Sequence, residues 1–128
     1  RSIVWGKLLI NVGINAITAL TGIKNGELLD LEATKALSRA AVEEAVAVAG
    51  AQNIDVREDV VAHVLEVARA TGANRSSMGQ DVDNRRLTEI GAINGVVVKE
   101  AERLGVPAPV NRTLTALVET LQAHYKKG

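Results

Sequence analysis

The chain has 128 residues and a mass of 13.5 kDa, which suits a single domain, residues 1–128, with its own core. Fifteen Lys and Arg balance fifteen Asp and Glu, so the sequence lacks the electrostatic footprint of a nucleic-acid-binding protein or a polybasic membrane-surface protein. A hydrophobic content of 47% excludes a disordered chain, and the absence of cysteine excludes disulfides, thiolate metal sites and a cysteine nucleophile.

Apolar residues recur with the 3.6-residue period of a helix along most of the chain, and strand-like alternation is scarce, which predicts an all-α fold. A first helix is expected over about Ile3–Leu20, ending near Gly22. After a loop, Glu27–Leu31 is expected to form one short turn. The Ala-rich segment that follows predicts a second long helix over Glu32–Ala49.

The second half of the chain predicts three further helices. Asp55 is a candidate N-cap for a helix over Val56–Ala70. The next segment, Asn74–Arg86, is polar and shows little periodicity, which stands out in so apolar a chain. A fourth helix is expected over about Asn84–Leu104 and a last one over about Val110–Lys126.

The chain has no sign of a membrane segment or a targeting signal. No apolar run approaches the ~18 residues that a membrane-spanning helix needs, and the start lacks the pattern of a signal peptide. The sequence therefore predicts a soluble, cytoplasmic protein. Because Arg1 opens directly ahead of a strongly apolar segment and there is no initiator Met, we expect a piece of a longer protein.

A polar stripe in the first expected helix is the strongest candidate for chemistry. Lys7, Asn11 and Asn15 are spaced i, i+4, i+8, so at about 100° per residue all three lie on one side of the helix. A solvent-facing edge would give the same pattern. However, Asn is a poor helix former that serves directed hydrogen bonding, and the flanking residues are strongly apolar. A pocket with one ammonium and two amides suits a small hydroxylated or carboxylated ligand.

Two loop segments carry weaker signals. Asn25 and Gly26 form a turn pair, which explains them without a ligand. Ser76 and Ser77 stand where a loop re-enters a helix, so we expect one of them to be the N-cap. The same position is favourable for an anion, because backbone N–H groups point outward at a helix N-terminus.

Glu89 is expected in the fourth helix, where a surface carboxylate is the ordinary explanation. Gly91 and Gly95, with Asn94 just before the second glycine, form a Gly-x-x-x-Gly pattern on that helix. This pattern allows another backbone or a ligand to approach closely, and in proteins of this kind it usually indicates a helix contact.

No metal site is expected. His63 and His124 fall in different helices without a carboxylate at a convincing spacing, so both are interpreted as incidental. Asp81, Asp83 and Asn84 resemble a calcium loop only weakly, because the required Gly and terminal Glu are missing. A glycine-rich phosphate-binding turn after a strand is also absent, so the chain has no nucleotide fold of its own.

Taken together, these residues closely resemble the C-terminal domain of the ketopantoate reductase (2-dehydropantoate 2-reductase) family. The resemblance runs nearly from end to end. It is carried by four blocks in the expected order: Trp5-Gly-Lys7-Leu-Leu-Ile-Asn11-Val-Gly-Ile-Asn15, Asn25-Gly26-Glu27, Asn74-Arg-Ser-Ser77-Met-Gly-Gln-Asp81 and Arg86-Leu-Thr-Glu89-Ile-Gly-Ala-Ile-Asn94-Gly95.

The resemblance implies the all-α C-terminal domain of the 6-phosphogluconate dehydrogenase C-terminal-like type, without its N-terminal Rossmann domain. In that family the Rossmann domain binds NADPH, and ketopantoate is reduced to pantoate in the cleft between the domains, in pantothenate and coenzyme A biosynthesis. The site residues that it implies are Lys7 as the catalytic proton donor, Asn11, Asn15, Asn25, Asn74 and Ser77 as substrate contacts, and Glu89 near the cofactor.

Two alternatives stay open at this point. The domain could serve a reductase for another short 2-keto acid, or it could be a freestanding helical module that binds a partner. Without a cofactor domain the chain should expose apolar surface, which favours a homodimer. Under the enzyme reading, this chain alone is expected to show no NADPH-dependent turnover.

Overall fold

The structure is a computed structural model and describes residues 3–127. In this part of the chain all regular elements are helical, which confirms the predicted all-α fold. The elements, in chain order, are α1 (Trp5–Thr21), the 3₁₀ helix η1 (Asn25–Leu29), α2 (Glu32–Ala51), α3 (Val60–Ala70), α4 (Ser77–Asp83), the 3₁₀ helix η2 (Ile90–Ala92), α5 (Asn94–Leu104) and α6 (Pro109–Lys127).

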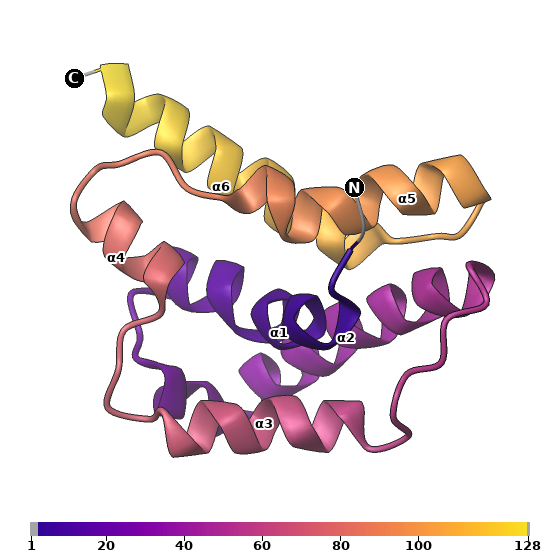
Figure 1. Ribbon diagram of the computed structural model, residues 1–128. Helices are drawn as coiled ribbons and strands as arrows, with labels where there is room; N and C mark the ends of the chain where they lie inside the picture. Colours follow the sequence, from indigo (N-terminus) through magenta and orange to yellow (C-terminus); the bar gives the residue numbers. More distant parts are fainter. Residues whose placement is uncertain (1–2, 128) are drawn as a thin grey trace.

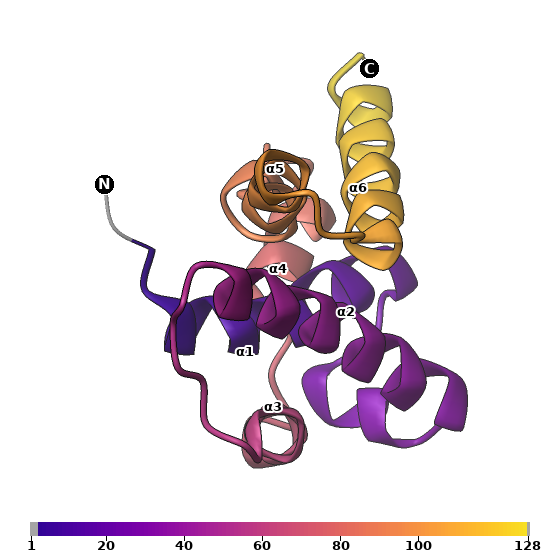
Figure 2. The same ribbon diagram turned by 90° about the vertical axis from the view of Figure 1, so that its right-hand side faces the viewer.

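The helices form three layers, with α1 and α2 in the middle (Figures 1 and 2). Helices α5 and α6 cover one side of this layer, and α3 covers the other. The short α4 packs beside the C-terminal part of α1. Helix α1 therefore lies at the centre of the domain, and Leu9, Val12 and Ile17 on it are almost fully buried. Within the described residues, no helix combines the length and the apolar composition needed to cross a membrane.

Gly13 allows the central helix to pack closely on its neighbours. A Cβ atom at this position would lie 2.6 Å from Val64 Cγ1 on α3 and 2.8 Å from Val42 Cγ2 on α2. Distances this short would force the side chains apart. The core around it is aliphatic, as the scarcity of aromatic residues in the sequence predicts.

The long helices begin and end close to their predicted bounds because local signals define them. Helix α1 ends at Gly22, whose φ of 79° is left-handed and whose N–H donates to the Thr18 carbonyl. Helix α6 begins at Pro109, and proline suits a first helical position because it lacks the N–H that would have no helical partner there.

The third helix begins four residues later than predicted, and Asp55 is not its N-cap. Arg57 and Asp59 instead form an ion pair, with Nε and Oδ1 2.6 Å apart, and the Val60 N–H closes a turn on the Arg57 carbonyl. This turn occupies the residues that the sequence assigned to the first helical turn, and α3 starts only at Val60.

The predicted fourth helix is also wrong in its first half. The chain takes a left-handed conformation at Arg85, with φ of 57°, and α5 starts only at Asn94. Three hydrogen bonds to α6 hold the intervening segment outside a helix: the Thr88 N–H and hydroxyl both donate to Gln122 Oε1, and the Tyr125 hydroxyl donates to the Arg86 carbonyl. In contrast, the polar segment before it contains a helix, α4.

Candidate active site

The stripe of Lys7, Asn11 and Asn15 lies along α1 and passes from the surface into the core. Lys7 is exposed, Asn11 is partly buried and Asn15 is only 7% exposed. The stripe is therefore not a solvent-facing edge. The Lys7 end of the stripe is accessible to a ligand, whereas the Asn15 end is enclosed by protein.

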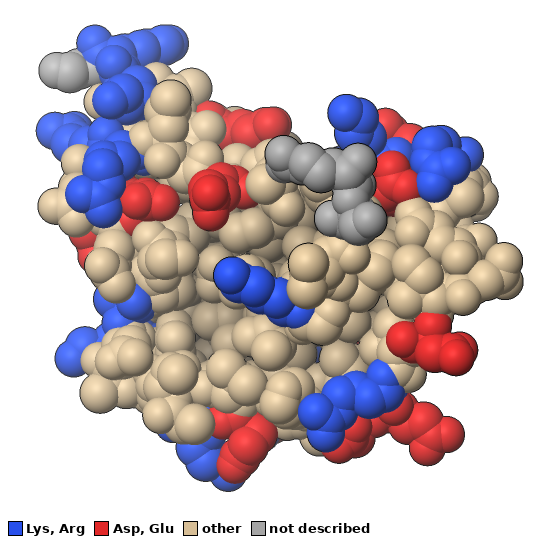
Figure 3. Space-filling view, in the orientation of Figure 1, with Lys and Arg blue, Asp and Glu red and all other residues tan. Residues whose placement is uncertain are grey.

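Lys7 and Asn11 line a cleft of about 440 Å³. Its other wall comes from η2 and its flanks, where Glu89 supplies a carboxylate and Ile93 and Val96 supply apolar surface. The face seen in Figure 3 is hollowed near its centre, where one Lys or Arg side chain lies among uncharged residues, and most other charged side chains lie towards its margins. The cleft thus places one ammonium, one amide and one carboxylate around an apolar floor.

The setting of Glu89 differs from the sequence expectation. It lies outside α5, directly ahead of the 3₁₀ helix η2, and it is exposed. The expected Gly-x-x-x-Gly helix contact is absent, because Gly91 belongs to η2 and a Cβ there would meet nothing within 4 Å. Only Gly95 is closely approached: its Cβ would lie 3.1 Å from the Ile90 carbonyl oxygen.

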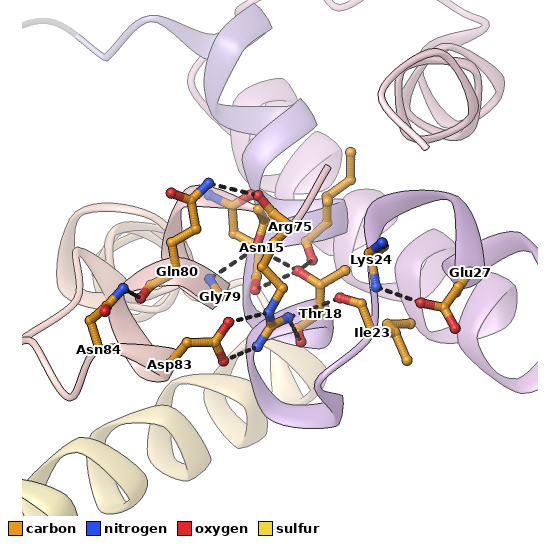
Figure 4. Close-up of polar contacts among 12 residues, drawn as sticks. Asn15, Thr18, Ile23, Lys24, Glu27, Arg75, Gly79, Gln80, Asp83 and Asn84 are labelled. Carbon is orange, nitrogen blue, oxygen red and sulfur yellow. Dashed lines mark hydrogen bonds and ion pairs between the residues drawn. The ribbon is translucent and has the colours of Figure 1, made fainter. Parts of the chain in front are cut away.

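A second polar cluster ties the C-terminal part of α1 to α4 (Figure 4). Ser76 is the N-cap of α4, because its Oγ accepts the Gly79 N–H at 3.0 Å, and it shares a 2.6 Å hydrogen bond with the Thr18 hydroxyl. Of the two serines, Ser76 is therefore the cap, as one of them was predicted to be. Ser77, the first residue of α4, is exposed.

Arg75 organises this cluster, and the sequence analysis missed it. Its guanidinium donates to the Thr18 and Ile23 carbonyls and to both carboxylate oxygens of Asp83, at 2.9 and 3.1 Å for the Asp83 bonds (Figure 4). The hydrogen bonds from Arg75 hold the pKa of the Asp83 carboxyl below its usual value. The only sequence signal was an arginine inside a short polar segment next to a capping serine.

Asn25 and Asn74 lie together, beyond the C-terminal end of α1 and so at the opposite end of the helix from Lys7. The Asn25 N–H donates to the Asn74 carbonyl at 2.9 Å, and Asn25 Nδ2 donates to the Thr71 hydroxyl at 3.0 Å. Asn25 is only 8% exposed, whereas Asn74 is exposed. Neither residue lines the cleft beside Lys7.

The chemistry available at the cleft is that of proton transfer and hydrogen bonding. An exposed ammonium can stabilise charge on an oxygen and donate a proton to it, and an amide can bind a hydroxyl or a carbonyl. Among residues 3–127, no group of three His, Cys, Asp or Glu side chains could hold a metal ion. His63 faces a separate, mainly apolar cavity beside Trp5, and His124 is exposed on α6.

Comparison with known families decides where the chain belongs. Residues 1–122 match the family model described as "Ketopantoate reductase PanE/ApbA C terminal". The chain belongs to this family of C-terminal domains. The resemblance stated from the sequence is thereby confirmed, and so is the fold type that it implies.

Relatives of this ketopantoate reductase C-terminal domain are longer proteins. A 2-dehydropantoate 2-reductase from Halobacterium salinarum is 42% identical over 93% of this chain, but the match covers only 39% of that protein. The crystal structure of a PanE/ApbA family ketopantoate reductase from Ralstonia eutropha is 34% identical in sequence, with a TM-score of 0.90. The match covers 95% of this chain and 41% of that protein chain. The chain thus spans about two fifths of the length of these two relatives.

One solved relative carries the name of a different enzyme. D-mandelate dehydrogenase, in a ternary structure with NADH and anilino(oxo)acetate, is 27% identical with a TM-score of 0.90. The match covers 95% of this chain and 68% of that one. Members of this domain type therefore occur with a nicotinamide cofactor in at least one solved structure.

Proposed function

We propose that this chain is the substrate domain of an NADPH-dependent 2-dehydropantoate 2-reductase, which reduces ketopantoate to pantoate. The observation that carries the proposal is the meeting of Lys7, Asn11 and Glu89 in one cleft, although Glu89 comes from a distant part of the sequence. A nicotinamide-binding Rossmann domain joined to this chain would close the cleft from outside. A cytoplasmic location remains a prediction.

In this proposal Lys7 is the proton donor. When bound, NADPH supplies a hydride, which forms the new C–H bond at C2 of the keto acid while the carbonyl electron pair moves to the oxygen. Negative charge grows on that oxygen, and the Lys7 ammonium stabilises it and then transfers a proton to form the hydroxyl. Because Lys7 is exposed at the mouth of the cleft, its ammonium can reach a substrate held there.

Further residues bind the two reactants. The Asn11 amide is placed one helical turn beyond Lys7, where it can bind the substrate carbonyl or hydroxyl. We assign Asn15, Ser77, Asn25 and Asn74 as further substrate contacts, although none of the four lines the cleft beside Lys7 in this structure. Asn25 is enclosed, so its contact would require the loop around it to open. Glu89 and the apolar wall beside it fit one side of a nicotinamide nucleoside, with the carboxylate accepting a hydrogen bond.

Another short 2-keto acid is the second candidate substrate. The likeness to D-mandelate dehydrogenase supports it, because that enzyme shares the domain in shape and at 27% identity. The apolar floor of the cleft would accept a branched aliphatic or an aromatic group equally well.

The test is NADPH oxidation by the longer protein in which this chain follows a nucleotide-binding domain. Ketopantoate, phenylglyoxylate and pyruvate are compared as substrates, each with NADPH and with NADH. Turnover that is fastest with ketopantoate and NADPH supports the proposal. Turnover confined to phenylglyoxylate would favour the second candidate substrate over ketopantoate. No turnover with any keto acid would contradict both candidate functions.

A further inference from the structure

The two walls of the cleft come from segments that are far apart in sequence and are joined mainly through other helices. One wall is the N-terminal half of α1, with Lys7 and Asn11. The other includes Glu89 and Ile93, at the start of α5. Helix α1 packs chiefly on α2 and α4, whereas α5 packs chiefly on α6 and α2. The distance between the walls therefore depends on what fixes α5 and α6 relative to α1 and α2.

A buried amide, Asn94, makes the direct polar link between the walls. It is the first residue of α5, directly after Ile93, and it is fully buried. Its Nδ2 donates to the Val12 carbonyl on α1 at a long 3.5 Å, and Val12 directly follows Asn11. The link thus joins the residues next to the two walls.

A second fully buried amide, Asn111, extends the link to α6 and α2. Asn94 Nδ2 also donates to Asn111 Oδ1 at 2.9 Å. In turn, Asn111 Nδ2 donates to the Ala41 carbonyl and to Glu44 Oε1 on α2, both at 2.9 Å. The Glu44 carboxylate accepts the Val110 and Asn111 N–H groups as well, so it caps the first turn of α6. One network therefore connects all four helices that set the width of the cleft.

Apolar packing alone would not need these amides. Asparagine is rare at fully buried positions, and Asn94 Oδ1 has no hydrogen-bond partner, so the pair is kept despite an unpaired acceptor. Hydrogen bonds between buried amides are directional, whereas the burial of apolar surface is not. Directionality is useful where one relative position of the helices has to be selected.

We infer that the Asn94–Asn111 pair, anchored by Glu44, is a positioning element that holds the wall of Glu89 and Ile93 in register with Lys7 and Asn11 on α1. The inference rests on the proposed function. Neither asparagine touches the reactants; each acts through the backbone of the wall beside it. A small displacement of one wall separates the proton donor from the residues that hold the cofactor side, and misplacements of about 1 Å cost roughly 100-fold in rate.

The test compares Asn94→Leu with a matched variant, Val118→Ala, in the longer protein that contains the nucleotide-binding domain. Val118 is fully buried on α6, two turns beyond Asn111, and it takes no part in the network. Thermal unfolding, kcat and KM for the keto acid are measured for both variants. Asn94→Ser, whose hydroxyl can still form one hydrogen bond, serves as a milder second variant if Asn94→Leu does not fold.

We expect kcat and kcat/KM of the Asn94 variant to fall together by roughly 10- to 100-fold, the pattern of an interaction made in the transition state. Val118→Ala should lower the melting temperature but keep kcat within about twofold, since it changes stability alone. Equal kinetics for the two variants at similar stability would overturn the inference. An unsubstituted protein without any turnover would overturn the proposed function first, and this inference with it.

Discussion

At the scale of single residues, the Lys7 side chain is accessible to a ligand and is not needed to hold the fold together. It is exposed, it lies at the mouth of the cleft, and it forms no ion pair among the residues that the structure describes. We therefore expect Lys7→Met to lower kcat of the longer reductase by about 100- to 10,000-fold, because a general acid contributes on that order. The free energy of unfolding should change by less than about 0.5 kcal/mol, as for other surface substitutions.

Steady-state NADPH oxidation and urea unfolding check this expectation. The matched control is Lys99→Met, which removes an exposed lysine on α5 outside the cleft and should leave kcat unchanged. If both variants keep their full rate, Lys7 is not the proton donor. If Lys7→Met loses its rate only together with its stability, the effect belongs to folding and not to catalysis.

The sequence predicted part of this site correctly for a simple reason. The i, i+4 spacing of Lys7 and Asn11 fixes their common side of α1 whatever the rest of the chain does. The burial of Asn15 and the place of Glu89 in the opposite wall depend on tertiary packing, which no local pattern contains. Arg75 was missed because two of its partners, at the C-terminal end of α1, are more than 50 residues away in the sequence.

At the scale of elements, two glycines allow η1 to rest on the loop after α3. The Gly26 N–H donates to the Gly72 carbonyl at 3.2 Å, and a Cβ at Gly26 would lie 2.8 Å from Gly72 Cα. Backbone cannot move aside as a side chain can, so Gly26→Ala should lower the free energy of unfolding by about 1–3 kcal/mol. Urea unfolding of the chain measures this.

Gly50→Ala is the matched control, because a Cβ at Gly50 inside α2 would meet nothing within 4 Å. There alanine replaces the poorest ordinary helix former, and the free energy of unfolding should rise by about 0.5–1 kcal/mol. Equal effects of the two substitutions would show that the contact of Gly26 with Gly72 does not limit stability.

The ion pair of Arg75 and Asp83, in the contact between α1 and α4, should make the free energy of unfolding depend on pH. Hydrogen bonds from Arg75 lower the pKa of Asp83 in the folded chain, so this carboxylate stabilises the fold at pH above its unfolded value of about 3.9. That contribution is lost as the pH falls through the lower, folded value. Asp83→Asn should therefore destabilise the chain at neutral pH and make the fall in stability below about pH 3.9 shallower.

The free energy of unfolding is measured by urea unfolding between about pH 2 and 7, in steps of about one pH unit, to test this linkage. Asp30→Asn is the control, since Asp30 is exposed and makes no ion pair among the described residues. An Asp83→Asn variant with the pH profile of the unsubstituted chain would show that the contact of Arg75 with Asp83 adds nothing to stability.

The bounds of some helices are fixed by residues within the helix itself, whereas other segments depend on contacts with distant parts of the chain. The predictions for α1, α2 and α6 are confirmed to within two residues, because alanine content, apolar period and glycine or proline at the ends act within each segment. The helix predicted over the segment from Arg85 to Glu89 is wrong, because the conformation of this segment is held by Gln122 and Tyr125 of α6. Tertiary contacts there override a periodic pattern that favours a helix.

At the scale of the whole molecule, residues 3–127 form both walls of the cleft but not the turn at which a dinucleotide is usually bound. Pyrophosphate is typically bound at a glycine-rich turn between a strand and a helix. The sequence has no Gly-x-Gly-x-x-Gly, and residues 3–127 form no strand. Val4, which lines the cleft, is 70% exposed, so apolar surface at this wall is left uncovered. Lys7, Asn11 and Glu89 thus meet in one cleft, whereas the described residues include no glycine-rich turn of this kind.

We therefore expect the 128-residue chain alone to oxidise no NADPH in the presence of ketopantoate, because the hydride donor would not be held against the substrate and the advantage of proximity would be lost. The loss of NADPH absorbance is followed for the chain, for the longer reductase as a positive control, and for the chain mixed with a separately prepared nucleotide-binding domain. Activity that appears only when both domains are present supports division of the site between them. Turnover by the chain alone at a rate like that of the longer protein would show instead that this helical domain binds the cofactor through residues other than a glycine-rich turn.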